Sequence, residues 1–167
     1  QGLHGPGRQR DAAVIVALMI WVDADACPAV IRDVLFRAAN RLAVTTTLVA
    51  NHHIRAPRSP HIHSVQVASG FDKADDHIAD RVSAGDLVIT GDIPLAARVV
   101  EAGGTALNPR GALYDAESIR EHLGRRDFME ELRSAGVETG GPSSLGKADV
   151  QTFANALDRF LARANRG

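Results

Sequence analysis

The stretch IWVDADACP, residues 20–28, constrains the fold more than any other part of this chain. Three apolar residues stop at two carboxylates, Asp23 and Asp25, and Pro28 follows. A proline suits the first position of a helix, where its missing N–H breaks no hydrogen bond. The apolar run is too uniform for an exposed edge strand, so it predicts a buried strand. Acids at the end of a buried strand are partly desolvated, and such groups usually face a cation, a phosphate or a reaction.

The rest of the sequence alternates apolar strands with amphipathic helices. We expect strands over residues 20–22, 44–50, 63–68, 86–90 and 105–108, and helices over residues 28–40, 73–83, 94–101, 115–123, 125–135 and 147–164. This alternation indicates a mostly parallel sheet with helices on both faces. The predicted fold class is α/β, with three layers around a central, mostly parallel sheet and a helical C-terminal third. The uniformly apolar first and fourth strands suit adjacent central positions.

Composition is ordinary for a globular chain of 167 residues, with 45% hydrophobic and 23% charged residues. The formal net charge of −1 argues against a dedicated non-specific nucleic-acid binder, because such domains usually carry a basic excess. The single cysteine, Cys27, excludes an internal disulfide and fits a reducing compartment.

The first 18 residues differ from the rest. They begin with a Gly/Pro/Arg segment and end in a short apolar run. We interpret residues 1–18 as an upstream extension, with Met19 as the candidate natural start and residues 19–167 as one domain. The apolar run is too short to span a bilayer and lacks the cleavage-site pattern of a signal peptide. We therefore expect a cytoplasmic protein.

Polar side chains follow three of the expected strands. Asp23 and Asp25 come after the first strand, Asn51 after the second, and Thr90-Gly91-Asp92 after the fourth. The carboxyl ends of parallel strands meet at one edge of the sheet, and the crevice there is where ligands bind in such folds. Sequence position alone therefore predicts that these groups converge.

A further acidic segment, GFDKADDHIAD, opens the helix before the fourth strand. Asp72, Asp76 and Asp80 are four residues apart and share one face of a helix that extends over all three, whereas Asp75 lies about 100° away. Carboxylates that converge repel one another unless a cation lies among them. Hard oxygen ligands without a thiolate indicate Mg²⁺ or Mn²⁺. Such a site can orient a phosphodiester and activate water for its hydrolysis.

A structural interpretation of the same acids is also open. An aspartate after a strand often caps the next helix, and both Asp25 and Asp92 stand just ahead of a helix-opening proline. We interpret Asp80 and Asp86 as solvated surface and turn acids.

Five long motifs resemble one family. They are WVDADACPAVIRDVLFRAA (21–39), LVAN (48–51), GFDKADDHIAD (70–80), GDLVITGDIPLAARVVEAGGTALNPRG (85–111) and RDFMEELRSAGVETGGPSSL (126–145). Together they resemble the YaiI/YqxD family of uncharacterised bacterial proteins over about residues 19–162. That family is placed among the PIN-like domains, whose better-known members are metal-dependent ribonucleases. The resemblance implies a PIN-like fold and, from the superfamily, nuclease chemistry.

The resemblance also implies roles for single residues. Asp23 matches the acid that ends strand one in PIN-like domains. The segment 73–76 resembles the Lys-x-x-Asp of the NYN branch, which makes Asp76 the matching acid, and the segment 90–92 resembles its Ser/Thr-Gly-Asp. NYN-type members usually carry a further acid two residues later, where this chain has Pro94. Asp25 is the candidate for that missing ligand.

Two other functions remain open. Asp-Ala-Asp after a strand also resembles haloacid-dehalogenase-type phosphatases, although the threonine and lysine that they require come in the wrong order here. The alternative without catalysis is an RNA- or nucleotide-binding module that uses a basic rim. Its candidate contacts are Arg55, Arg58, Arg110, Arg125, Arg126 and Lys147.

The histidines and the cysteine fit a structural interpretation better. His52, His53, His61 and His63 match no structural zinc spacing and are interpreted as surface-loop residues. No histidine is placed beside Cys27 to activate it as a nucleophile.

The function predicted from the sequence is divalent-metal-dependent hydrolysis of phosphodiesters, of RNA before DNA, with Mg²⁺ or Mn²⁺ as the cofactor. The predicted catalytic residues are Asp23, Asp76 and Asp92, the predicted metal ligands are these three with Asp25, and the predicted substrate-binding residues are Asn51, Lys73, Thr90 and Arg110.

Overall fold

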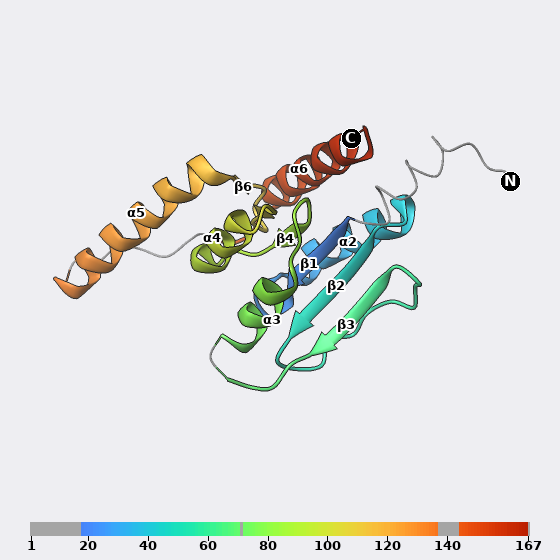
Figure 1. Ribbon diagram of the computed structural model, residues 1–167, viewed down its shortest axis with the longest axis horizontal. Coiled ribbons are helices and arrows are strands. Elements are labelled where there is room, and N and C mark those ends of the chain that lie inside the picture. The colour runs from blue at the N-terminus through green and yellow to red at the C-terminus, as the bar shows by residue number, and fades with distance from the viewer. Residues whose placement is uncertain (1–17, 71, 137–143, 167) are drawn as a thin grey trace, which may run out of the picture.

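A six-stranded sheet runs through the centre of the protein (Figure 1). The computed structural model describes residues 18–70, 72–136 and 144–166, so predictions about residues 1–17 lie outside the described residues. The strands are β1 Met19–Asp23, β2 Thr45–Ala50, β3 Ile62–Gln66, β4 Leu87–Ile89, β5 Thr105–Leu107 and β6 Leu113–Tyr114. Their order is β3-β2-β1-β4-β5-β6, and only the β5–β6 pair is antiparallel. The predicted α/β class, the mostly parallel sheet and the adjacency of β1 and β4 are confirmed.

Helices of the described chain separate consecutive strands up to β5, except β2 and β3, which are joined by the loop over residues 51–61. The helices are α2 Ala29–Leu42, α3 Lys73–Arg81, α4 Ile93–Glu101, α5 Ala116–Ser134 and α6 Lys147–Arg166, with a short 3₁₀ turn, η1, over Ala24–Ala26. The prediction of two helices over 115–123 and 125–135 is wrong, because α5 continues through Gly124. A glycine inside a helix destabilises it by only about 1 kcal/mol, which a well-capped helix tolerates. The Asp115 and Ser118 side chains form a capping box at its start.

Helices cover both faces of the sheet, as the three-layer prediction requires. Ile20 and Val22 of β1 pack with α2 and α6 on one face, while Trp21 packs with α3 and α4 on the other. Figure 1 shows α3 and α4 in front of the strands and α5 running outward beyond them. Among the described residues of α5, only Ile119 is buried. The core therefore has two apolar halves that share the sheet between them.

Asp86 is part of the buried framework, and its interpretation as a solvated turn acid is wrong. The residue is 3% exposed. It accepts hydrogen bonds from the backbone N–H groups of Met19 (3.1 Å) and Ser83 (2.9 Å) and from Nε1 of Trp21 (3.2 Å). Three donors compensate its desolvation. Asp86 therefore links the beginning of β4 to its neighbouring strand β1 through side-chain hydrogen bonds.

The turn after β5 is fastened to α6. Oδ1 of Asn108 accepts hydrogen bonds from the N–H groups of Arg110 (2.8 Å) and Ala112 (3.2 Å), which closes the turn. Gly111 has a φ of +99°, and a Cβ added there would lie 2.6 Å from the Thr152 side chain of α6. Only glycine combines this backbone conformation with such a close approach.

Candidate functional site

The point where the chain order reverses in the sheet lies between β1 and β4. From β1 the chain proceeds outward to β2 and β3, whereas β4 leads to β5 and β6 on the other side. In parallel sheets the crevice at such a point, outside the carboxyl ends of the strands, is the usual ligand site. Asp23 is the last residue of β1, Thr90 follows β4 directly, and Asp92 immediately precedes α4. These three residues therefore meet at the expected position.

Thr90 connects the two acids. The residue is 1% exposed, and its hydroxyl donates a hydrogen bond to Oδ2 of Asp23 across 2.9 Å. The same oxygen accepts one from the backbone N–H of Asp92 at 3.0 Å. A hydroxyl has one donor and two acceptor positions, so both bonds can form at once. Thr90 therefore orients Asp23 and fixes the turn that carries Asp92; its predicted contact with substrate stays a prediction.

Asp23 is held in an environment that disfavours its charge. Burial raises the pKa of the Asp23 carboxyl above its ordinary value, Asp92 and Asp25 raise it further, and the hydrogen bond from Thr90 opposes the shift. Every fully buried side-chain oxygen in the described chain has a hydrogen-bond partner. Oδ1 of Asp23 has no hydrogen-bond partner there, so the residual 7% exposure of this residue leaves that oxygen open to the crevice.

Asp92 is a helix cap as well as a site acid. Its Oδ1 accepts a hydrogen bond from the N–H of Leu95 at 2.9 Å, which is the capping role that its position before Pro94 indicates. Oδ2 of Asp92 has no hydrogen-bond partner within the described chain. The residue is therefore fixed by one oxygen and can present the other.

The helix α3 brings Asp75, rather than Asp76, toward these acids. The pKa of Asp75 is raised to about 6 by burial and then by Asp92 and Asp23. Asp76, the acid that the resemblance implies, is exposed and contacts Nη1 of Arg98 at 2.9 Å. The role of Asp76 as a metal ligand stays a prediction, but its one described side-chain contact is this ion pair across the α3–α4 interface.

Asp25 lies on the β2 side of the crevice. It does not cap α2, whose first residue is preceded by Pro28 without a side-chain cap. Instead Oδ2 of Asp25 accepts a hydrogen bond from the N–H of Asn51 at 2.9 Å, and Oδ1 lies 2.6 Å from Nδ1 of His52. His52 is a surface-loop residue, as the sequence indicates, with a side chain 62% exposed, but its contact with Asp25 was not predicted. The side chain of Asn51 is exposed.

The two predicted cationic substrate contacts, Lys73 and Arg110, differ in how they are engaged within the protein. Lys73 is exposed at the first position of α3, with its aliphatic stem against Gly70. Nη1 of Arg110 contacts Oδ2 of Asp149 on α6 at 2.9 Å, which is a structural role for that guanidinium. Both remain predictions as substrate contacts.

Cys27 is buried, with 4% of its surface exposed. Burial raises the pKa of the Cys27 thiol to about 12, and the opposing effect of Arg32 is smaller. This effect outweighs the lowering expected for a thiol near a helix N-terminus. The structural interpretation of Cys27 agrees with this environment.

The described residues contain no group of three or more His, Cys, Asp or Glu side chains arranged closely enough to enclose a metal ion. Instead, Asp92 lies near enough to Asp23 and Asp75 to raise the pKa of both carboxyls. Such a group of acids can bind a cation through few direct ligands, or offer fixed negative charge and hydrogen-bond acceptors to a ligand.

The comparisons with known proteins concern almost the whole chain. A family model described as uncharacterised BCR, YaiI/YqxD family, matches residues 21–163. The chain belongs to the YaiI/YqxD family. Its relatives include UPF0178 proteins of Syntrophotalea carbinolica, 61% identical, and Halorhodospira halophila, 65% identical, each over 146 residues. These alignments cover 87% of this chain and 99% and 97% of the relatives.

A further family relative is the UPF0178 protein of Aeromonas hydrophila, 62% identical over 144 residues, which are 86% of this chain and 96% of that protein. No solved structure matches the chain. Within the described ranges, every helix is too short or too polar to cross a membrane.

Proposed function

We propose that this protein is a divalent-metal-dependent phosphodiesterase of the PIN-like type that hydrolyses RNA. The observation that supports this is electrostatic. Asp23 and Asp75 each have a pKa raised by burial and by neighbouring carboxylates, and Asp92 acts on both. Groups held so that they oppose one another's ionisation are a mark of functional sites. A bound cation removes this repulsion, which makes it the simplest partner for the crevice.

The donors present fit a hydrated Mg²⁺ or Mn²⁺ better than an enclosed ion. Mg²⁺ usually keeps several waters and binds through one or two carboxylates together with substrate phosphates. Asp23 and Asp92 each have one carboxylate oxygen without a hydrogen-bond partner in the described chain. These two oxygens, with Asp75 nearby, are the groups that would hold the ion. When bound, the ion supplies charge neutralisation and a more acidic water.

The protein's own residues carry the remaining roles. Thr90 keeps Asp23 oriented through its 2.9 Å hydrogen bond, and the N-terminal turn of α4 keeps Asp92 in position. Asn51 and Lys73 have exposed side chains at the ends of β2 and the start of α3, where they can bind a phosphate oxygen. These groups lie at the same edge of the sheet as the acids, which suits a phosphodiester held beside the carboxylates.

A Mn²⁺ titration by calorimetry tests the proposal and separates two acids of α3. We expect one saturable site in the wild type, lost in Asp23→Asn and strongly weakened in Asp75→Asn. Asp76→Asn is the matched variant, because this acid is adjacent in sequence but engaged by Arg98. It should keep the site, and Asp80→Asn serves as a further surface-acid control. The wild type and each variant are then incubated with a fluorescent single-stranded RNA and Mn²⁺, and the products are resolved on a denaturing gel.

Absence of saturable Mn²⁺ binding, with and without RNA present, would exclude the nuclease mechanism. Weakening by Asp76→Asn rather than Asp75→Asn would return the third ligand to the residue that the resemblance implies.

The second candidate function is RNA or nucleotide binding without catalysis. Two observations favour it: the described side chains enclose no ready-made metal cluster, and Asp92 already serves as a helix cap. Saturable RNA binding that is independent of metal, with no cleavage, would identify this function. A beryllofluoride adduct on Asp23 would instead indicate a phosphatase.

A further inference from the structure

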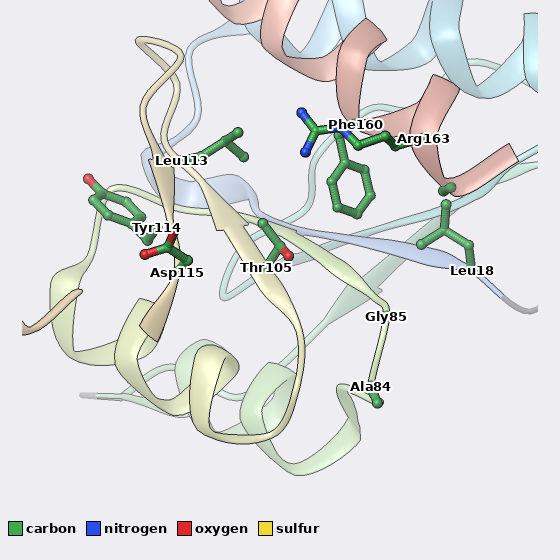
Figure 2. A pocket seen from close by; sticks show the side chains of 10 residues that line it. Leu18, Ala84, Gly85, Thr105, Leu113, Tyr114, Asp115, Phe160 and Arg163 are labelled. Carbon is green, nitrogen blue, oxygen red and sulfur yellow. The ribbon is translucent and has the colours of Figure 1, made fainter. Parts of the chain in front are cut away.

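A cavity lies at the opposite ends of the strands from the acids. It measures about 620 Å³ and opens at the amino ends of β1, β4 and β5, away from the carboxyl ends that carry the acids. Figure 2 shows side chains from the sheet and from α6 arranged around it. The lining includes Leu18, Thr105, Leu113, Asp115, Phe160 and Arg163.

The cavity has the size and lining of a small-molecule site. Ligand pockets usually measure about 300–1,000 Å³ and combine apolar walls with a few polar groups. Leu18 and Phe160 are only partly buried, and Leu113 of β6 is 36% exposed, so apolar surface faces the opening. The hydroxyl-bearing Thr105, at the start of β5, lies among these walls. An apolar body would therefore gain free energy by entering.

One cationic side chain at the mouth of this cavity, the exposed Arg163, has no partner among the described residues. The guanidinium of Arg163 lies near Phe160 and Leu113 in Figure 2, and it makes no ion pair or hydrogen bond with the described residues. The other charged group at the cavity is Asp115. Its Oδ1 accepts hydrogen bonds from the N–H groups of Glu117 and Ser118, which lower its pKa and satisfy its charge locally.

We propose that this cavity binds a small amphiphile with one anionic head group and a hydrocarbon body. The Arg163 guanidinium receives the head group, because its planar donors match a carboxylate bidentately. The leucine and phenylalanine walls receive the hydrocarbon. This site is independent of the proposed nuclease function, since it shares no residue with the acidic crevice.

Decanoate is the test ligand, and decanol is its matched uncharged control. Calorimetric titration of the full chain with decanoate should show one saturable site, with decanol at least tenfold weaker. Arg163→Gln should lower decanoate affinity about tenfold or more, the range for a lost charge-assisted hydrogen bond. Arg159→Gln, one turn earlier on α6 and outside the cavity lining, should leave the affinity unchanged. Leu113→Trp should reduce binding of both ligands by filling the opening.

The proposal is overturned if decanoate does not saturate, if decanol binds equally well, or if Arg163→Gln and Arg159→Gln behave alike. Circular-dichroism melting of each variant establishes that it is folded before it is titrated. Asp23→Asn provides a last comparison, because it should leave decanoate affinity unchanged whatever its effect on Mn²⁺ binding.

Discussion

The Thr90 hydroxyl lies 2.9 Å from the Asp23 carboxylate and joins the ends of two neighbouring parallel strands, β1 and β4, through one buried hydrogen bond. It is also the acceptor for the Asp92 N–H. A single small side chain thus determines the relative positions of two acids that are far apart in sequence. The site's geometry depends on the hydroxyl rather than on the carboxylates, which repel one another.

Replacing Thr90 by valine should therefore affect both stability and the site. The change leaves the buried Asp23 carboxylate without its donor, and it should lower the free energy of unfolding by about 1–3 kcal/mol. Thr90→Ser keeps the hydroxyl and is the control. Urea denaturation measures the stability, and Mn²⁺ calorimetry measures the site. Equal stability of the valine and serine variants would show that the hydrogen bond contributes little.

Asp75 predicts a pH-dependent stability. Its carboxyl has a pKa of 3.8 when unperturbed and about 6 in the fold, so the folded state holds the proton more tightly. Its favourable contribution is fully present below pH 3.8 and is lost as the pH rises toward 6. Asp75→Asn should therefore be more stable than the wild type at pH 7.5, by on the order of 1 kcal/mol because solvent screens this partly exposed group.

The Asp75→Asn advantage should vanish near pH 4. Urea denaturation at both pH values measures it, and Asp80→Asn is the surface control. Mg²⁺ at pH 7.5 should stabilise the wild type more than Asp75→Asn, and an equal gain would argue against a role for Asp75 in cation binding.

Gly111 provides a test of the contact between the β5 turn and α6. Gly111→Ala adds a Cβ at a φ of +99°, 2.6 Å from the Thr152 side chain and 2.8 Å from its backbone carbon. Gly85→Ala adds one at a φ of +90° with no atom within 4 Å. Both variants incur backbone strain of about 1 kcal/mol, but only Gly111→Ala adds a clash, so its melting temperature should fall clearly further. Matching losses would mean that the turn moves freely on α6.

Cys27 should be chemically silent in the folded protein. A thiol with a pKa of about 12 has almost no thiolate at pH 8, and this one is also buried. Ellman's reagent should react with Cys27 only in denaturant, or at the rate at which the protein opens. Rapid stoichiometric reaction of the native protein would contradict the described packing around Cys27.

The layout of the sheet was predictable because buried parallel strands are encoded by local apolar runs. Ile20–Val22 and residues 86–90 indicate central strands without any knowledge of tertiary contacts. The acids that follow these strands could then be assigned to one edge by topology alone. Asp23 and Asp92 accordingly lie where the sequence predicts.

What could not be predicted depends on how elements pack. Asp75 and Asp76 differ by one helix position, and only the packing of α3 beside α4 decides which faces the crevice and which meets Arg98. The contact between Asp25 and His52 likewise joins η1 to the loop after β2, and no local pattern encodes their approach. The sequence indicates a turn acid at Asp86, because the hydrogen bonds that it accepts, including the one from Trp21, depend on tertiary packing.

The sheet order has a consequence for how the molecule assembles. β1 pairs on one side with β2, after a connection that contains α2, and on the other with β4, which begins more than sixty residues after β1 ends. During synthesis the β1–β2–β3 half emerges first. Asp23 then lies on the side of β1 that β4 will pair with, before Thr90 is present to donate its hydrogen bond. The crevice comes into being only when the second half docks. Any ligand that binds Asp23 and Asp92 together must therefore stabilise the completed sheet relative to either half alone. Its binding free energy adds to the free energy of docking the two halves.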